Sequence, residues 1–280
     1  MGEIRVFYKD CKNMSEVEDN SVHLVITSPP YYNYKDYKNG ECEQIGGITH
    51  TYERYISDLS KVWEECYKKL TPGGKLCINV PNMKSRKSVE GLSFLYPIVA
   101  DVTKSCINLD YIFFDEIIWV KGSANAGALK GKPLFGSYPY PPNFKILDSI
   151  QESILIFKKP GMPKNKKDEL TKEKSKLTKK EWLDFTQGVW FIKPEFQNKG
   201  HCAVFPLELP YRLIKLYSFV GDTVLDPFLG SGTTLLACKL LDRNGIGYEI
   251  NSLYKEIIDK KINLSQRKLE EFNNSKILLN

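Results

Sequence analysis

The sequence predicts an α/β protein with a mostly parallel β-sheet and helices on both of its faces. Two observations support this fold class: a strand–helix–strand pattern occurs in each half of the chain, and several short apolar runs have the character of strands buried on both faces. With 280 residues, 42% hydrophobic and 26% charged, the chain is long enough for one large core. We therefore expect one main domain with a smaller insertion.

In the first half, apolar runs predict strands at Ile4–Phe7 and Val22–Ile26. A helix is expected over Tyr55–Leu70, where apolar residues recur at helical spacing. Pro72-Gly73-Gly74 ends this helix, and the apolar residues that follow predict a strand over Lys75–Val80.

The second half of the chain has the same strand–helix–strand order after an irregular stretch. Residues 122–144 are crowded with glycine, proline and aromatic residues and cannot form a regular element of the core. The expected elements are strands at 111–120, 153–158, 223–225 and 245–250, and helices at 209–219, 233–241 and from Leu253 onward.

The positive charge of the chain is concentrated in one segment. The net charge is +6, and residues 158–180 alone contain ten lysines against three acidic residues. Such a segment can neutralise phosphates or can be a solvated linker, and both interpretations stay open. No stretch has the length and apolar character of a membrane span, and charges interrupt the start of the chain, so we expect a cytoplasmic protein that does not enter membranes.

Seven cysteines are scattered through the chain without a CxxC pair. This spacing favours reduced thiols over disulfides, and it predicts no metal site. We do not expect a cysteine nucleophile.

A glycine turn, Phe228–Gly232, lies inside the stretch DPFLGSGTT between an expected strand and an expected helix. Its glycines let a ligand approach the backbone, and the helix start offers unpaired N–H groups. Glu249, at the end of the next strand, suits the two hydroxyls of a ribose. A nicotinamide enzyme is an alternative, although Leu235 stands where its motif has a third glycine. A purely structural turn is another.

A proline turn, Ser28–Tyr31, lies in the stretch TSPPYY, which directly follows the strand ending at Ile26. Two prolines stiffen the backbone and remove its N–H groups, so the carbonyl oxygens remain available as acceptors. The Ser28 hydroxyl and a proline carbonyl are expected to hold the two N–H bonds of a planar amine and to direct its lone pair at a methyl donor. An ordinary structural turn is the alternative.

Together the two motifs resemble the beta group of amino-methylating DNA methyltransferases, in which the catalytic half precedes the cofactor half. The resemblance spans nearly the whole chain and includes Asp10 and the segments 117–121, 201–206 and 245–249. It implies a Rossmann-like, seven-stranded, mostly parallel sheet with helices on both faces and a small inserted target-recognition region. It also implies S-adenosylmethionine as cofactor and double-stranded DNA as partner.

Carried over residue by residue, the resemblance implies two groups at one site. The catalytic group is Ser28, Pro29, Pro30 and Tyr31, with Tyr31 stacking on a base flipped out of the helix. In the cofactor group, Glu249 holds the ribose, Asp10 lies near the adenine amino group, and Phe205, Pro206 and Thr233 border the methionine portion. The full cofactor group is Asp10, Phe205, Pro206, Asp226, Phe228, Gly230, Gly232, Thr233 and Glu249.

The same resemblance divides the chain into a catalytic half (1–121), an insertion that reads DNA (122–193) and a cofactor half (194–280). The strand at 153–158 is expected to return from the insertion to the sheet. Aromatic side chains are predicted to enter a DNA groove or to hold open the gap that a flipped base leaves in the double helix. Lysines are predicted to contact phosphates. The predicted DNA contacts are Tyr32, Lys35, Lys130, Lys132, Tyr138, Tyr140, Lys164, Lys166 and Lys167.

Cytosine N4 is the expected target because the cytosine-amino members usually have serine at the position of Ser28. Adenine N6 is an alternative, as is an RNA or a protein amide as substrate. A non-catalytic DNA-binding protein is the rival from another functional class. A pairing with a restriction endonuclease is expected from the resemblance alone, and the choice between monomer and homodimer stays open.

Overall fold

The computed structural model describes residues 2–32, 45–47, 50–85, 90–92, 94–122, 150–163, 166–194 and 206–263. Within these ranges the chain forms one large sheet in the order β1-β10-β9-β2-β3-β7-β6-β8 and a small two-stranded sheet, β4-β5. The strands are β1 (Ile4–Phe7), β2 (Val22–Thr27), β3 (Leu70–Val80), β4 (Met83–Lys84), β5 (Leu95–Tyr96), β6 (Ile112–Val120), β7 (Gln151–Lys158), β8 (Val189–Phe191), β9 (Thr223–Asp226) and β10 (Asn244–Tyr248).

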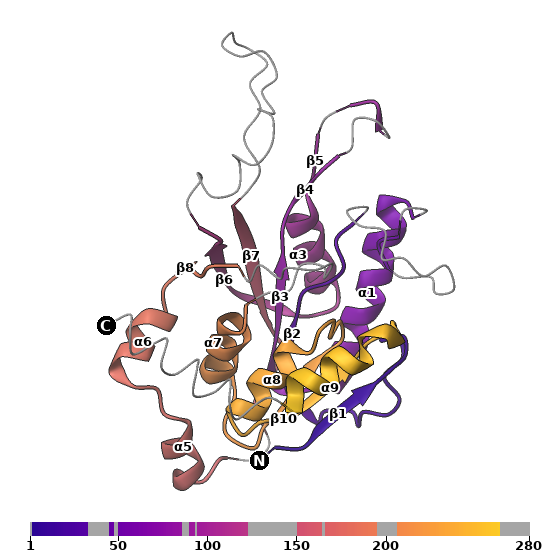
Figure 1. Ribbon diagram of the computed structural model, residues 1–280. Coiled ribbons are helices and arrows are strands. Elements are labelled where there is room, and N and C mark those ends of the chain that lie inside the picture. The colour runs from indigo at the N-terminus through magenta and orange to yellow at the C-terminus, as the bar shows by residue number, and fades with distance from the viewer. Residues whose placement is uncertain are drawn as a thin grey trace.

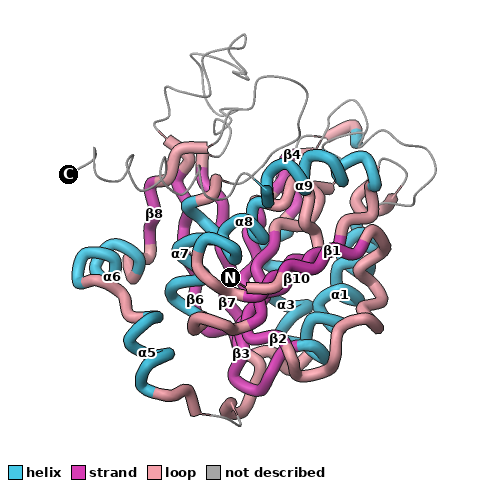
Figure 2. The backbone as a smooth tube through the Cα atoms, turned by 60° about the horizontal axis from the view of Figure 1, so that its bottom comes forward, coloured by secondary structure: helices cyan, strands magenta, loops and turns pink. Residues whose placement is uncertain are grey.

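Helices cover both faces of the large sheet (Figures 1 and 2). One face packs against α1 and α3, and the other against α7 and α8, with α9 beside α8. The helices are α1 (Tyr52–Lys69), α3 (Ile98–Asn108), α5 (Glu169–Ser175), α6 (Lys179–Phe185), α7 (Glu208–Tyr217), α8 (Thr233–Leu240) and α9 (Lys255–Asn263), with a 3₁₀ turn, η1, at Ser252–Tyr254.

Among the described strands of the large sheet, only β7 runs against the others, because it pairs antiparallel with both β3 and β6 while every other pairing is parallel. Seven strands therefore end at the same edge of the sheet, which we call the carboxyl edge, and β7 begins there. In open α/β sheets this edge is where ligands bind.

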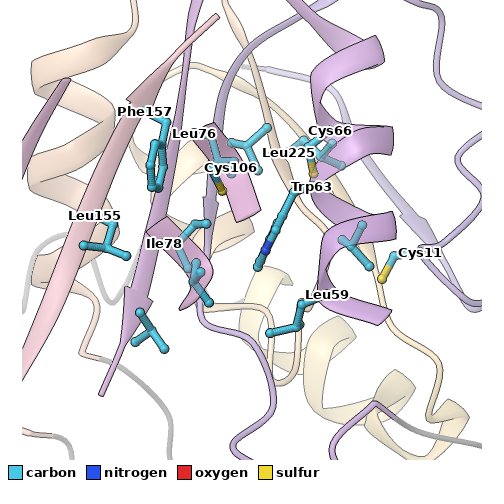
Figure 3. Packing of buried hydrophobic residues seen from close by; sticks show 14 of the residues in the cluster. Cys11, Leu59, Trp63, Cys66, Leu76, Ile78, Cys106, Leu155, Phe157 and Leu225 are labelled. Carbon is cyan, nitrogen blue, oxygen red and sulfur yellow. The ribbon is translucent and has the colours of Figure 1, made fainter. Parts of the chain in front are cut away.

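The core lies between the sheet and its helices. Figure 3 shows Leu59, Trp63 and Cys66 of α1 facing the sheet residues Leu76, Ile78 and Leu155. All six side chains are at most 1% exposed. Their four-residue and three-residue spacing on α1 is the helical repeat that the sequence shows. Burial of these apolar groups fixes α1 on this face of the sheet.

The structure differs from the sequence-based expectation in the number of strands. The large sheet has eight strands rather than seven, because β8 adds to β6 as a parallel edge strand through Ile118–Val189, Trp119–Trp190 and Val120–Phe191. In addition, β3 begins at Leu70, so Pro72-Gly73-Gly74 lies inside the strand rather than before it. The pairing register shifts between Val22–Leu70 and Leu24–Lys75, so the extra residues of this stretch form an irregularity in β3.

The lysine-rich segment also contains the short helix α5 and the start of a second, α6, which its composition did not predict. Asp168 caps α5 through the amide of Thr171, and Thr178 and Glu181 form a capping box at the start of α6. Both devices satisfy backbone N–H groups that a helix start leaves unpaired. Local capping therefore supports helices where apolar periodicity is weak.

The cysteines in the described part of the chain are buried, free thiols: Cys11, Cys66, Cys77, Cys106 and Cys238. Burial raises the pKa of each of them. Among the described residues, no group of three His, Cys, Asp or Glu side chains is placed to hold a metal ion. No helix in the described ranges has the length and apolar character needed to cross a bilayer.

Candidate active site

The proline turn and the glycine turn follow neighbouring strands. Strand β2 pairs in parallel with β9 through Leu24–Val224 and Val25–Leu225. The proline turn begins one residue after β2 ends at Thr27, and the glycine turn begins two residues after β9 ends at Asp226. Both turns therefore leave the carboxyl edge side by side, although 199 positions separate Thr27 from Asp226.

A buried hydrogen-bond network joins the two strand ends. The Asp226 carboxylate accepts from the Thr27 hydroxyl at 2.8 Å, from the Thr234 hydroxyl at 2.6 Å and from the Phe228 amide at 3.0 Å. Asp226 is fully buried, and this burial raises the pKa of its carboxyl group to about 6 against the three hydrogen bonds, which lower it. The network holds both turns and the start of α8 in fixed relation.

The glycine turn leaves open space beside its backbone. Gly230 has φ +54° and Gly232 has φ +86°, both in the left-handed region that favours glycine. A Cβ atom at Gly230 would meet one atom within 4.0 Å, its own turn's Phe228 carbonyl oxygen. Phe228 itself packs edge-on against Trp63 of α1, with 6.1 Å between ring centroids. The turn is thus anchored on its core side and open at Gly230.

Glu249 lies directly after β10 and contacts the glycine turn. One carboxylate oxygen accepts from the Gly230 amide and the other from the Asn251 amide, each at 2.8 Å. Burial raises the pKa of the Glu249 carboxyl group to about 7. Asp10 follows the adjacent strand β1, whose Phe7 carbonyl accepts from the Glu249 amide at 3.0 Å. Both predicted carboxylates therefore lie at the carboxyl edge, Glu249 in contact with the glycine turn and Asp10 after β1, on the far side of β10.

Thr233, at the start of α8, and Pro206, just before α7, were predicted to border the methionine portion of the cofactor. The Thr233 hydroxyl, in the first turn of α8, accepts from Lys261 of α9 at 2.8 Å, and Lys261 also donates to Ser231 at 2.6 Å. Pro206 is buried just before α7. The far end of α7 lies at the opposite edge, where Ser218 accepts from Arg243 next to the start of β10. A helix of this length spans ~15 Å, so Pro206 lies towards the carboxyl edge.

The proline turn is held from two sides. The Pro30 carbonyl accepts from the Tyr55 hydroxyl of α1 at 3.0 Å. The Tyr31 hydroxyl donates to Glu152 of β7, also at 3.0 Å. Pro29 is buried, while Ser28, Pro30 and Tyr31 are half-buried. The structure therefore brings all four predicted catalytic residues to the carboxyl edge beside the glycine turn.

Tyr32 does not have the position expected for a DNA contact. Its side chain is 7% exposed, its hydroxyl donates to the His50 carbonyl at 3.1 Å, and its ring packs against Tyr52, Tyr55 and Tyr96. This aromatic cluster buries Tyr32 beneath the turn. We correct the prediction accordingly and interpret Tyr32 as a support for the proline turn.

Lys167 likewise has a partner inside the protein. Its ammonium group lies 2.5 Å from the Asp222 carboxylate, which precedes β9 and so lies at the edge opposite the two turns. Lys166, an exposed residue, is its neighbour. In Figure 1, α5 follows these lysines at the bottom, whereas β4 and β5 extend from the carboxyl edge at the top. The geometry separates this pair of lysines from the two turns.

The remaining predicted contacts lie outside the described residues. They are the DNA contacts Lys35, Lys130, Lys132, Tyr138, Tyr140 and Lys164, together with Phe205 of the cofactor group. Gly122 and Ile150, which flank the stretch 123–149, are both described and lie at the carboxyl edge, where the Lys121 amide donates to the Ile150 carbonyl at 2.7 Å.

Some side chains that support the site were not among the predicted site residues. Thr27 and Thr234 bond Asp226, and Glu152 and Tyr55 bond the proline turn. Glu152 did carry a signal, because it is an acidic residue directly before the expected strand at 153–158, which contains the apolar run Ile154–Phe157. The helical repeat accounts for the burial of Tyr55 and gives no sign of its hydroxyl bond.

Comparison with known proteins identifies relatives along nearly the whole chain. Residues 22–260 match the N6/N4 methyltransferase family model, described as DNA methylase. The type II methyltransferase M.MjaI of Methanocaldococcus jannaschii is 34% identical over 95% of this chain and 93% of its own. M.MthZI of Methanothermobacter thermautotrophicus is also 34% identical, over 92% of this chain and 76% of its own length.

Solved structures show the same architecture. The putative DNA modification methylase TTHA0409 of Thermus thermophilus, solved with S-adenosyl-L-methionine, has a TM-score of 0.73 and 31% identity, covering 95% of this chain and 94% of its own. The cytosine-N4-specific PvuII DNA methyltransferase has a TM-score of 0.69, covering 98% and 92% of the two chains. Its identity is 19%, so this likeness concerns the fold alone.

Proposed function

The chain belongs to the N6/N4 DNA methylase family, and from this premise we propose that it methylates the N4 amino group of cytosine in duplex DNA. S-adenosylmethionine is the cofactor of this family. One observation carries the proposal: the proline turn and the glycine turn leave neighbouring strands, joined by the 2.8 Å hydrogen bond between Thr27 and Asp226. A donor at one turn and an acceptor amine at the other would then face each other.

The residues around the glycine turn suit S-adenosylmethionine. Gly230 leaves room against the backbone, and α8 presents its N-terminal amide groups there. Glu249 and Asp10 offer carboxylate acceptors to hydroxyl and amino groups. We assign the ribose to Glu249, the adenine amino group to Asp10 and the methionine side to Pro206, Phe205 and Thr233. The bound cofactor supplies an electrophilic sulfonium methyl group.

The proline turn can present the amine. The lone pair of an exocyclic amino group is delocalised into its ring, so the amine needs orientation before it can attack. We assign one N–H bond to the Ser28 hydroxyl and the other to the Pro29 carbonyl, because the Pro30 carbonyl already accepts from Tyr55. Both acceptors favour a pyramidal nitrogen and direct its lone pair towards the methyl group. After transfer, the amine loses its extra proton to water.

Tyr31 supplies an aromatic face to a base that has left the double helix. Its ring belongs to a half-buried residue whose hydroxyl is tied to Glu152, so the ring has a defined position. We propose that the insertion 122–193 reads the DNA, since Gly122 and Ile150 bracket its first part at the carboxyl edge. This insertion separates a catalytic half, 1–121, from a cofactor half, 194–280.

Cytosine is proposed over adenine because of Ser28 in the proline turn. Duplex DNA lacking methylation, such as phage DNA grown in a methylation-deficient host, should be incubated with the protein and methyl-labelled S-adenosylmethionine and then digested to nucleosides. We expect labelled N4-methyldeoxycytidine by mass analysis. If labelled N6-methyldeoxyadenosine is the only product, the target base is adenine rather than cytosine. If no nucleoside is labelled, the proposed function is overturned.

Two experiments, a comparison of substrates and a binding measurement, separate the other substrates and functional classes. Offered separately as methyl acceptors with labelled S-adenosylmethionine, duplex DNA should become labelled, whereas structured RNA and protein should not. A non-catalytic DNA-binding protein would bind duplex without measurable affinity for S-adenosylmethionine, so equilibrium binding of the cofactor distinguishes it. We further propose, from the type II relatives, that the chain protects host DNA against a restriction endonuclease.

A further inference from the structure

Beside the proline turn lies a polar cluster in which the buried Glu152 and Asn79 meet the half-buried Tyr31 and Lys121. Glu152 is 3% exposed and lies near the start of β7, at the carboxyl edge. Its carboxylate accepts from the Tyr31 hydroxyl at 3.0 Å, from the Asn79 amide nitrogen at 2.6 Å and from the Lys121 ammonium group. The carboxylate therefore links β7 to both neighbouring strands and to the proline turn.

Two of these partners come from the strands on either side of β7. Asn79 lies on β3 and Lys121 directly follows β6, and both strands pair with β7. The amide orientation of Asn79 follows from chemistry, because a carboxylate only accepts and so requires the Nδ2 group. The carboxylate is thus fixed from both flanks by the sheet. Tyr31 is the partner that belongs to the turn.

The cluster is not explained by stability alone. The Oδ1 atom of Asn79 is buried and has no hydrogen-bond partner among the described residues. A buried acceptor without a donor lowers stability, and an apolar cluster of similar volume would avoid this cost. A polar arrangement maintained at this cost beside the proline turn suggests a functional role.

We propose that Glu152 is a positioning residue for methyl transfer, acting through Tyr31. It holds the tyrosine hydroxyl so that the ring stands at a fixed angle beside Ser28 and Pro29, ready to stack on the flipped base. This inference rests on the proposed function of the proline turn. Glu152 itself touches neither the base nor the cofactor. Its effect should therefore appear in turnover and leave S-adenosylmethionine affinity unchanged.

A double-mutant cycle tests this role. Tyr31→Phe keeps the ring and removes the hydroxyl, and Glu152→Leu removes the carboxylate. Loss of a hydrogen bond to a charged group corresponds to a drop in kcat of about tenfold, so we expect each variant to fall by about that factor. Because both changes break the same contact, the double variant should fall by about tenfold as well, rather than about a hundredfold.

Three further variants make the result specific. Glu152→Gln retains an acceptor oxygen for Tyr31 and should restore kcat to within about threefold of the parent chain. Tyr111→Phe removes a core hydroxyl that donates to the Trp63 carbonyl at 3.0 Å and should lower stability with kcat unchanged. Glu116→Leu, an exposed position on β6, should behave as the parent. If Glu152→Leu does not fold, Tyr31→Phe and Glu152→Gln still test the contact.

The outcomes separate this inference from the proposed function. Unchanged kcat in Tyr31→Phe, or multiplicative losses in the double variant, would overturn the positioning role while the parent still methylates DNA. Loss of cofactor affinity in parallel with kcat would also overturn it. Failure of the parent chain to methylate DNA under the same conditions would instead overturn the proposed function.

Discussion

Thr27 donates a hydrogen bond of 2.8 Å to Asp226, and this contact ties together the ends of the two strands that carry the site. Because the strands are neighbours and parallel, the turns that follow them must leave the same edge. A pair of motifs that are distant in the sequence thereby becomes one candidate site. The predictions below follow from this arrangement.

Thr27→Val should destabilise the fold. Valine has nearly the shape of threonine and removes one of the three donors to the buried Asp226 carboxylate. A hydrogen bond to a charged group contributes about 1.5–3 kcal/mol, and we expect a loss of that order in the free energy of unfolding. Urea denaturation at pH 8 measures it. Thr223→Val, at the opposite end of β9, is the matched control, and equal losses in both variants would contradict the role of the contact.

Gly230→Ala should weaken S-adenosylmethionine binding by at least about tenfold, because a methyl group occupies the open side of the turn where the ligand approaches the backbone. Gly221 is the control: it also has a left-handed φ, +80°, and open space around it, but it lies at the opposite edge. Gly221→Ala should lose similar stability with full cofactor affinity. Equilibrium dialysis distinguishes the two, and equal affinities would contradict the placement of the cofactor.

Cofactor affinity should rise with pH through about 7. Burial raises the pKa of Glu249 to about 7 from its ordinary value of 4.5, so lowering the pH below 7 protonates the group in the folded protein. The ionised form is the better acceptor for ribose hydroxyls, and affinity is therefore highest above pH 7 and falls below it. Calorimetric titration at pH 6 and pH 8 measures the change. In Glu249→Gln the affinity should be lower at pH 8 and this pH dependence should vanish; its persistence would mean that another group is responsible.

Ser28→Ala should reduce turnover far more than cofactor binding. The hydroxyl orients one N–H bond of the amine, and its loss should lower kcat by about 10²-fold with the S-adenosylmethionine dissociation constant within about twofold. Single-turnover labelling gives the rate, and equilibrium dialysis gives the affinity. Ser175→Ala, in α5 at the other edge, serves as the control. Parallel loss of both quantities in Ser28→Ala would mean that the residue supports the fold instead.

The fold was predictable from the sequence wherever burial and periodicity agree. Strand β2 is a continuous apolar run, and helix α1 has one apolar face. The observed limits of both elements match the expected limits to within a few residues. Helix α3 was not predicted, because its β-branched residues Ile98, Val99 and Val102 favour strands in isolation. Its contact with α1 decides the conformation. Edge strand β8 has three residues, too few for a periodic signal.

The candidate site was predictable in its two motifs but not in its supports. Ser28 and Gly230 lie in turns with distinctive composition, so the sequence locates both. Glu152 and Asn79 acquire their importance only when β7 inserts between β3 and β6, a pairing that no local pattern specifies. Lys167 shows the converse, because a lysine-rich composition suggests phosphate contacts while its partner here is Asp222.

The most direct test of the central claim is the sequencing of DNA from cells that express either the parent chain or Ser28→Ala, with chemical identification of each methylated base. The account predicts N4-methylcytosine at one recurring sequence context with the parent chain and its loss with Ser28→Ala at equal protein levels. DNA without methylation above the host background, or equal methylation by both chains, would contradict it.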